Sequence, residues 1–329
     1  MKGFDYYRVT TISQTISLLS RHGEKAAILA GGSDMLAMMK DRVEGPKLHP
    51  PQHIIDITGI RELAYIKEQK NWLKIGAATT IGEIAASPLI VAKYPLLTRA
   101  AGQVAVPQIR NIGTLGGNLC QRPRCWYFRG KPFTDCFRKG GNNCYAPTGE
   151  NQYHAIFGGE NCYMVCPSDM ASALTALNAR VEIATAKGNR FIPIEQFYAR
   201  PAKQILKETA LGPAEMVVAV EVPVSAPNSK GTYFKLKERQ AFDFAVVSVA
   251  ALVTFKENIV SDARIVLGGV APFPLRANGA ETALKGKRIT DGLGAACKAA
   301  AQGASPLSNN SYKVKATKGL VEAALTSLA

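Results

Sequence analysis

The stretch ILAGGSDML, residues 28 to 36, sets two adjacent glycines directly behind an apolar run. Upstream, Ile12, Ile16 and Leu19 share one helical face, with Thr10 or Thr11 as the cap and Gly23 at the end. The pattern predicts a helix, a strand at 26–30 and a turn at 31–34. Adjacent glycines let a turn bring several N–H groups against one anion, because no Cβ stands in the way. The turn therefore suits a phosphate, although plain turn chemistry accounts for the same residues.

A second glycine segment, IRNIGTLGGNL at 109–119, has the same character, and the hydroxyl of Thr114 adds a donor as that of Ser33 does in the first. Neither segment fits the G-x-G-x-x-G or the G-x-x-x-x-G-K-[ST] pattern. Each turn by itself is weak evidence for a nucleotide. The two together make a phosphate-containing ligand a working hypothesis.

The alternation of helical and strand patterns favours α/β layers in the first part of the chain. Thr80 and Glu83 form a capping box that opens a helix. A linker rich in Pro, Ser, Asn and Gly, VPVSAPNSKGT, predicts a domain boundary near 224–230, before a smaller α+β domain. The remaining predicted elements are strands at 53–57, 73–78, 181–184, 216–222, 245–255 and 263–270, and helices at 169–179, 290–303 and 311–329.

The chain has 329 residues, 47% hydrophobic content and a formal net charge of +15, which fits a globular protein of more than one domain. The basic residues are scattered and no nucleic-acid-binding signature accompanies them, so we expect no nucleic-acid partner. The sequence contains neither a secretion signal nor an apolar run long enough to span a membrane. We expect a cytoplasmic protein, or a periplasmic one if it is exported folded with a signal-bearing partner.

Cysteines cluster in CQRPRCWYFRGKPFTDCFRKGGNNC, residues 120–144, which holds four of the seven; Cys162 and Cys166 follow, and Cys297 lies far away. Three disulfides are one reading, but disulfide-rich scaffolds are short and poor in core residues, which favours reduced thiols that serve as ligands. Zinc and an iron–sulfur cluster are the competing occupants. Only Cys162 and Cys166 have the close spacing typical of structural zinc.

Nine ordered blocks resemble the FAD-binding subunit of the molybdenum hydroxylases, the family of xanthine dehydrogenase, carbon monoxide dehydrogenase and aldehyde oxidoreductase. The resemblance covers nearly the whole chain. The blocks are FDYYRVTTISQ, ILAGGSDML, HIIDITGI, LKIGAATTIGEI, QIRNIGTLGGNL, PSDMASAL, EMVVAVEVP, YFKLKERQAFDFAVVSVAA and LGGVAPFPLRANGAE.

The resemblance implies an α+β fold, in which an FAD-binding domain of the vanillyl-alcohol oxidase/PCMH type precedes a smaller C-terminal domain like that of the carbon monoxide dehydrogenase flavoprotein. The expected limits are 1–225 and 230–329. The first domain would contain two subdomains, roughly 1–58 and 59–225, with an iron–sulfur loop inserted at about 120–165.

The same resemblance implies an FAD site. The first glycine turn would bind the pyrophosphate, Asp169 the ribose and adenine side, and Val217 and Lys235 the flavin. For Asp169, stabilisation of a helix N-terminus is the alternative role, and Lys235 has the alternative of a solvated strand lysine. The implied FAD-binding residues are Ala30, Gly31, Gly32, Ser33, Asp34, Met35, Ala105, Gly113, Thr114, Gly117, Asn118, Asp169, Val217 and Lys235.

The cysteine loop resembles that of 4-hydroxybenzoyl-CoA reductase and of bacterial molybdenum aldehyde oxidoreductases, which carry a [4Fe–4S] cluster. The match begins at R-x-R-C-x-Y-F and implies four ligands, with Cys120 and Cys166 as possible replacements; they are Cys125, Cys136, Cys144 and Cys162. Iron clusters need thiolates, and the arginines and lysine of this loop would favour that form.

The function implied is that of an electron-transfer subunit with FAD and a [4Fe–4S] cluster, with no catalytic residues of its own. A large molybdopterin-binding catalytic subunit and a small [2Fe–2S] subunit would be its partners, and an external acceptor would take the electrons. An aldehyde oxidoreductase is the expected class. The alternatives are a stand-alone FAD oxidoreductase of the vanillyl-alcohol oxidase type and a basic iron–sulfur regulatory protein.

Overall fold

The computed structural model describes all 329 residues, which form two compact units that each combine three separate segments of the chain. The expected inserted loop at 120–165 is divided, since its first part belongs to unit 1 and its second part to unit 2. Unit 1 comprises Met1–Glu83, Pro107–Tyr145 and Ala179–Pro223, and unit 2 comprises Ile84–Val106, Ala146–Asn178 and Val224–Ala329.

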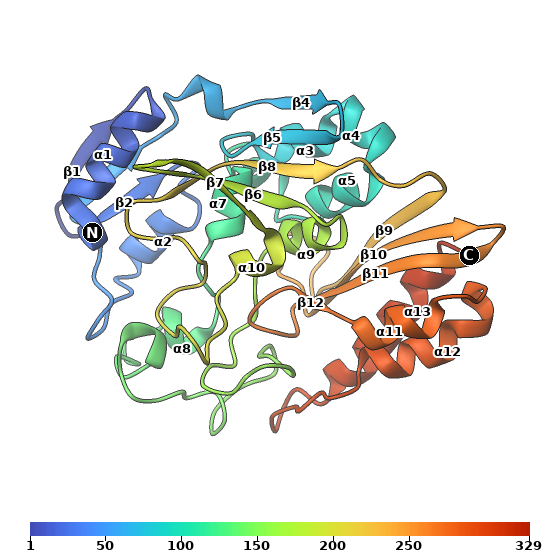
Figure 1. Cartoon of the computed structure of the whole chain (residues 1–329). Coiled ribbons are helices and arrows are strands. Elements are labelled where there is room, and N and C mark those ends of the chain that lie inside the picture. The colour runs from blue at the N-terminus through green and yellow to red at the C-terminus, as the bar shows by residue number, and fades with distance from the viewer. The chain divides into compact units, whose positions relative to one another are not determined.

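Unit 1 contains two sheets and several short helices (Figure 1). Its elements are β1 (Asp5–Arg8), α1 (Ile12–His22), η1 (Gly23–Lys25), β2 (Ala26–Leu29), α2 (Met35–Lys40), β3 (His53–Asp56), η2 (Arg61–Leu63), β4 (Ile66–Gln69), β5 (Trp72–Gly76), the start of α3 (Ile81–Ala86), α6 (Pro107–Arg110), α7 (Leu115–Cys120), α8 (Trp126–Arg129), η3 (Phe137–Lys139), β6 (Arg180–Thr185), β7 (Gly188–Pro193), α10 (Ile194–Phe197) and β8 (Met216–Pro223).

The smaller sheet of unit 1 is parallel, with β3 between β1 and β2. Ile54 and Ile55 of β3 are buried, as expected for the central strand of a sheet with both neighbours in place. Helix α1 begins where Thr11 accepts a hydrogen bond from the Gln14 amide, and it ends at Gly23 with φ of 54°. Its buried face, Ile16 and Leu19, joins the core that supports the first glycine turn.

The larger sheet of unit 1 is antiparallel, in the order β4-β5-β8-β6-β7. Strand β8 lies in its centre, and every residue from Met216 to Val222 is buried. The backbone amide of Ala77, just after β5, donates to the Val218 carbonyl, and Thr80 and Glu83 form the predicted reciprocal capping box. The segment that supports the second glycine turn is thereby attached to the sheet.

Unit 2 is built on an antiparallel sheet in the order β12-β11-β10-β9, with helices α11 and α13 packed against it and α12 packed against these two helices (Figure 1). Small residues let α11 and α12 approach closely, because a Cβ on Gly292 would stand 3.0 Å from the Ala283 carbonyl oxygen. Its elements are α4 (Pro88–Lys93), α5 (Pro95–Gly102), α9 (Asp169–Ala176), β9 (Ser229–Leu236), β10 (Val247–Lys256), β11 (Ile259–Gly268), β12 (Leu275–Arg276), α11 (Asn278–Leu284), α12 (Ile289–Ala300) and α13 (Tyr312–Thr326).

The elements predicted from periodicity are confirmed, with ends that differ by a few residues. The sequence patterns did not identify five strands that border their sheets, which are β1, β4, β7, β9 and β12. They also missed α2, α10, α11 and the short helices between 84 and 129. Helices of four to eight residues contain too few turns to establish a period. None of the helices combines the length and the apolar character that crossing a bilayer requires.

Candidate functional site

The two glycine turns, far apart in the sequence, meet in unit 1. A Cβ built on Gly31 would collide with the carbonyl oxygen of Ile112 and stand 3.0 Å from the Cα of Gly113. Gly32 has φ of 70°, in the left-handed region that favours glycine. A Cβ on Gly113 would lie 3.9 Å from the Ser33 hydroxyl oxygen. The turns therefore form one backbone surface whose close approach requires glycine.

The second turn leads into α7, where Thr114 accepts a hydrogen bond from the Gly117 amide at 3.2 Å. Backbone bonds attach this turn to the segment after β5, since the amide of Gly116 donates to the Ala77 carbonyl at 2.8 Å. Apart from its chain neighbours and the backbone of α7 itself, only the Thr114 hydroxyl oxygen lies within 4 Å of a Cβ built on Gly117. Such an open cradle of backbone groups suits a pyrophosphate, and it gathers nine of the expected FAD-binding residues, Gly31 to Met35 with Gly113, Thr114, Gly117 and Asn118.

Two other expected residues of unit 1 contribute to its core. Ala30 follows β2 and packs against the apolar cluster that contains Ile55 and Val218. Val217 is buried in β8, where it pairs with Ile183 of β6. Both side chains pack in the apolar core of the sheet. Such side chains can offer FAD an apolar contact but not a polar one.

The remaining three expected residues are gathered in unit 2. Lys235 of β9 donates to Asp169 at 2.7 Å and to the Gln103 carbonyl at 3.0 Å, two residues before Ala105, whose φ is 41°. The hydroxyl of Tyr233 donates to the other Asp169 oxygen at 2.6 Å. Burial first, and then the Asp169 charge, raise the pKa of Tyr233 well above its usual value, so its hydroxyl remains a donor. Lys235 is therefore a buried partner of Asp169 and not a solvated strand lysine.

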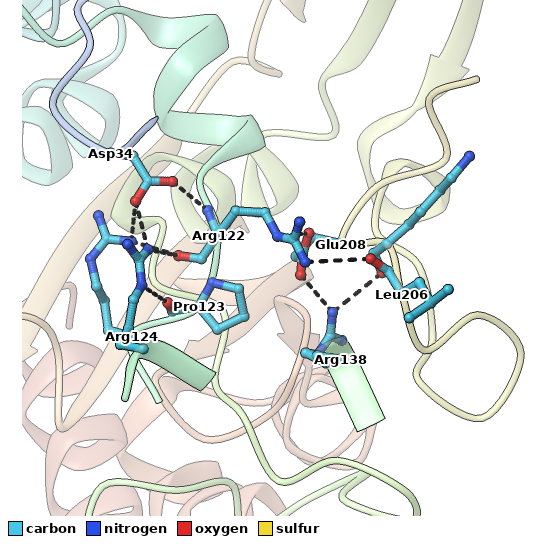
Figure 2. Close-up of polar contacts among 9 residues, drawn as sticks. Asp34, Arg122, Pro123, Arg124, Arg138, Leu206 and Glu208 are labelled. Atoms are coloured by element: carbon cyan, nitrogen blue, oxygen red, sulfur yellow. Dashed lines mark hydrogen bonds and ion pairs between the residues drawn. The ribbon is translucent and has the colours of Figure 1, made fainter. Parts of the chain in front are cut away.

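Asp34 stands at the N-cap position of α2, yet its side chain makes no capping bond. It accepts instead from the Arg122 amide at 2.7 Å and from the guanidinium groups of Arg124 and Arg129, each at 2.6 Å (Figure 2). Burial lowers the pKa of Arg124 to about 10 while Asp34 opposes that shift, and the group stays charged at neutral pH. The first glycine turn is thus attached to the cysteine loop through a carboxylate.

Three of the expected cluster ligands belong to unit 1. Cys125 and Cys136 pack into the same small apolar cluster, around Val43 and Phe128. Cys136 pairs with Asn143 in an isolated β-bridge, and Cys144 is the residue that follows Asn143. The buried ammonium of Lys139 donates to the Gly130 carbonyl at 2.7 Å. Burial lowers the pKa of Lys139, and the nearby Cys136 and Cys125 act in the opposite direction. Thiols near a fixed cation suit an anionic, thiolate-bound metal group.

The fourth expected ligand, Cys162, lies in unit 2 with Cys166, and both are buried. No disulfide joins any of the seven cysteines. Burial, with a further effect of Glu208, raises the pKa of the Cys120 thiol to about 12, so this thiol is protonated at neutral pH in the absence of a metal. No group of three or more His, Cys, Asp or Glu side chains is arranged to hold a metal ion.

Comparison with known proteins decides the family. A family model described as the FAD binding domain in molybdopterin dehydrogenase matches residues 2–225, and one described as the CO dehydrogenase flavoprotein C-terminal domain matches residues 232–328. The chain belongs to this flavoprotein family. Its expected fold class, an FAD-binding domain followed by a smaller C-terminal α+β domain, is confirmed, and so is its assignment as an oxidoreductase flavoprotein.

Named relatives cover nearly the whole chain. The aldehyde oxidoreductase FAD-binding subunit PaoB of Escherichia coli is 34% identical over 97% of this chain and 96% of its own. The carbon monoxide dehydrogenase medium chain of Hydrogenophaga pseudoflava is 31% identical, over 87% of this chain and 82% of its own. Among solved structures, carbon monoxide dehydrogenase from Hydrogenophaga pseudoflava, in a form that lacks the Mo-pyranopterin moiety, matches with a TM-score of 0.77 and 29% identity, over 99% of this chain and 97% of that one.

Sequence reasoning did not find the ionic partners of the cysteine loop. It assigned the loop arginines to thiolates, whereas three of them contact Asp34 and two contact Glu208. Glu208 lies in a segment without any motif, and it pairs with residues about 70 to 86 positions away, so no local pattern could have indicated it. Tyr233 was likewise missed, although it precedes Lys235 by one strand repeat and faces the same way.

Proposed function

We propose that this chain is the FAD- and [4Fe–4S]-containing electron-transfer subunit of a heterotrimeric molybdenum hydroxylase, of the aldehyde oxidoreductase class. Substrate oxidation would occur on a large molybdopterin-binding subunit. Electrons would pass through a small [2Fe–2S] subunit to this chain and on to an external acceptor. The name of PaoB, an aldehyde oxidoreductase FAD-binding subunit, supports the class, and the name of the carbon monoxide dehydrogenase medium chain supports a multi-subunit assembly.

The observation that carries the FAD part of this proposal is the contact of Gly31 with Ile112, which joins the two glycine turns into one cradle. A dinucleotide needs such a close backbone approach at its pyrophosphate. Bound FAD supplies two-electron acceptance and release of electrons singly or as a hydride. The chain's own part is to hold and orient the group, with Ser33 and Thr114 near the phosphates and Val217 toward the ring. Asp169 was expected at the ribose and adenine side and Lys235 at the ring, but because the two form one ion pair, we propose that they act together at a single part of the group.

The test of flavin identity is acid release followed by chromatography. We expect one non-covalent FAD per chain, because none of the residues expected to contact FAD is a cysteine or histidine that could link the flavin ring. Free FMN, or flavin that remains attached to peptide after denaturation, would contradict the assignment. The measurement requires only the purified chain and no substrate.

We further propose that Cys125, Cys136, Cys144 and Cys162 bind the [4Fe–4S] cluster. Support comes from the packing of Cys125 with Cys136, from the bridge between Cys136 and Asn143, the residue before Cys144, and from the buried ammonium of Lys139. Thiolate ligands and compensating cations are what such a cluster requires. Zinc is the competing occupant, and quantitative metal and sulfide analysis separates the two.

The subunit role is tested by co-expression with neighbouring genes. We expect a complex that survives gel filtration and oxidises aldehydes with a dye acceptor, whereas this chain by itself should turn over no substrate. An active flavoenzyme obtained from this gene by itself would instead favour a stand-alone oxidoreductase. We place the complex in the cytoplasm, or in the periplasm if a signal-bearing partner carries it there, and fractionation of the native host tests this location.

A further inference from the structure

The Arg-Pro-Arg segment at 122–124 connects two carboxylates that lie far apart in the sequence (Figure 2). At one end, Asp34 of the first glycine turn accepts from the backbone amide of Arg122 and from the side chain of Arg124. At the other end, the guanidinium of Arg122 forms an ion pair with Glu208, in which Nε lies 2.6 Å from a carboxylate oxygen. One residue, Arg122, therefore contacts both carboxylates, through its backbone at one and its side chain at the other.

Glu208 also reaches into the cysteine loop. Its second oxygen accepts from Arg138 at 2.6 Å, and Arg138 lies two residues after Cys136. The Arg138 side chain is 1% exposed and that of Glu208 is 9% exposed, so water competes little for this pair. Charge-assisted bonds at such burial are strong, and removal of one partner leaves the other charge poorly solvated.

The bridge between the two carboxylates is itself held in one conformation. The side chain of Arg124 donates to the Arg122 carbonyl at 2.6 Å, and Nε of Arg129 donates to the Pro123 carbonyl at 2.7 Å. The guanidinium groups of Arg122 and Arg129 also stack on the buried ring of Phe128, 5.0 and 5.8 Å from its centroid. A bridge fixed in this way transmits a displacement from one end to the other instead of absorbing it.

We propose that Asp34 and Glu208 are positioning residues that couple the order of the cysteine loop to the order of the first glycine turn. The functional consequence of this coupling rests on the proposed function. If the turn binds FAD and the loop binds the cluster, retention of either group would favour retention of the other. Neither carboxylate needs to touch the cluster for this effect. Linkage requires the coupling to be reciprocal, so a change at either end should loosen the other.

Amide hydrogen exchange on the full chain, read by mass spectrometry, tests the coupling directly. In flavin-free Glu208→Gln protein we expect peptides from residues 28–36 to exchange about tenfold faster, within the range typical of coupled sites. Asp34→Asn should produce the reciprocal rise in peptides from 122–144. The exchange rates of peptides from β5 and β8 should remain unchanged. A rise in those rates as well would indicate a general loosening of unit 1.

The matched control is Glu215→Gln. Glu215 is a half-buried carboxylate of the same unit that accepts two bonds from Arg190, at 2.9 and 2.7 Å, and takes no part in the bridge. The Glu215→Gln substitution should leave amide hydrogen exchange in both the first glycine turn and the cysteine loop unaltered. A Glu208→Gln protein that loosens only the loop would overturn the proposal, and so would equal loosening of β5 and β8.

FAD titration adds a second readout. We expect Glu208→Gln to weaken FAD binding about tenfold, and to have no further effect once Asp34→Asn is present, because both act through one bridge. Additive effects would overturn the coupling. If wild-type protein takes up no FAD, the proposed function fails at that step, while the exchange measurement still decides whether turn and loop are coupled.

Discussion

Lys235 and Asp169 are each other's partners, with the ammonium nitrogen 2.7 Å from a carboxylate oxygen and both side chains buried. The pair joins strand β9 to the first turn of α9. Tyr233 occupies the second carboxylate oxygen, and Lys235 also contacts the carbonyl of Gln103. Two residues expected to contact FAD separately thus belong to one charged group, and replacing either one should affect the other.

Lys235→Met should destabilise the protein by about 3 kcal/mol, because it leaves a buried carboxylate without its ion-pair partner. Urea denaturation followed by circular dichroism measures the change. Lys237→Met is the control, since the Lys237 ammonium donates to the side chain of Gln103 in an exposed bond, and we expect less than about 1 kcal/mol there. Equal losses of unfolding free energy in the two variants would mean that the buried ion pair stabilises the protein no more than the exposed hydrogen bond does.

Gly31→Ala should abolish FAD retention, because the new Cβ would collide with the Ile112 carbonyl and force the two turns apart. Gly32→Val should act similarly, through its left-handed φ and its contact with Leu36. Flavin content per chain after gel filtration is the measurement. Gly102→Ala, where no atom lies within 4 Å of the new Cβ, should retain a full complement of flavin. A Gly31→Ala protein with one FAD per chain would show that the pyrophosphate binds elsewhere.

Cys136→Ser and Cys144→Ser should each remove the iron, which we expect at about four irons and four sulfides per chain in anaerobically prepared wild type. The loop should also become sensitive to protease, because cluster binding would help to order it. Cys120→Ser is the matched control in the same loop, and its iron should stay complete, since Cys120 is not one of the four expected ligands. Stoichiometric zinc without sulfide in the wild type would rule out the cluster and leave the FAD assignment standing.

His154 should make the protein less stable in acid. Burial first, and then the Lys313 charge, lower the pKa of His154 from 6.5 to about 4 in the folded state. In the unfolded chain His154 would bind a proton near pH 6.5, but in the folded chain only near pH 4. The contribution of neutral His154 to the free energy of unfolding is therefore fully present above about pH 6.5 and falls as the pH drops toward 4. This shift corresponds to a loss of about 3 kcal/mol by pH 4.

Urea denaturation at a series of pH values checks this prediction. His154→Asn should show a shallower decline between pH 6.5 and 4 than the wild type, because the titrating group is gone. His49→Asn, which removes a histidine of unit 1, should decline as the wild type does. Identical pH profiles for wild type and His154→Asn would contradict the role of His154.

The local elements of this fold follow from the sequence because their determinants are local. Thr11 and Gly23 delimit α1, Thr80 and Glu83 open α3, and alternating or continuous apolar runs predict β3 and β8. The ordered glycine, PSD and strand motifs likewise led to the family, since they are short segments whose backbone requirements restrict the residues allowed.

Tertiary structure alone decided which of these segments meet. The sequence contains both glycine turns, but only folding brings Gly31 against Ile112. Nothing near Asp34 indicates that its carboxylate binds the cysteine loop instead of capping α2, and nothing near Glu208 indicates Arg122 and Arg138. The physical reason is that hydrogen-bond and ion-pair partners are selected by proximity in the folded chain, where burial makes each unpaired charge costly, and proximity across many residues has no local signature in the sequence.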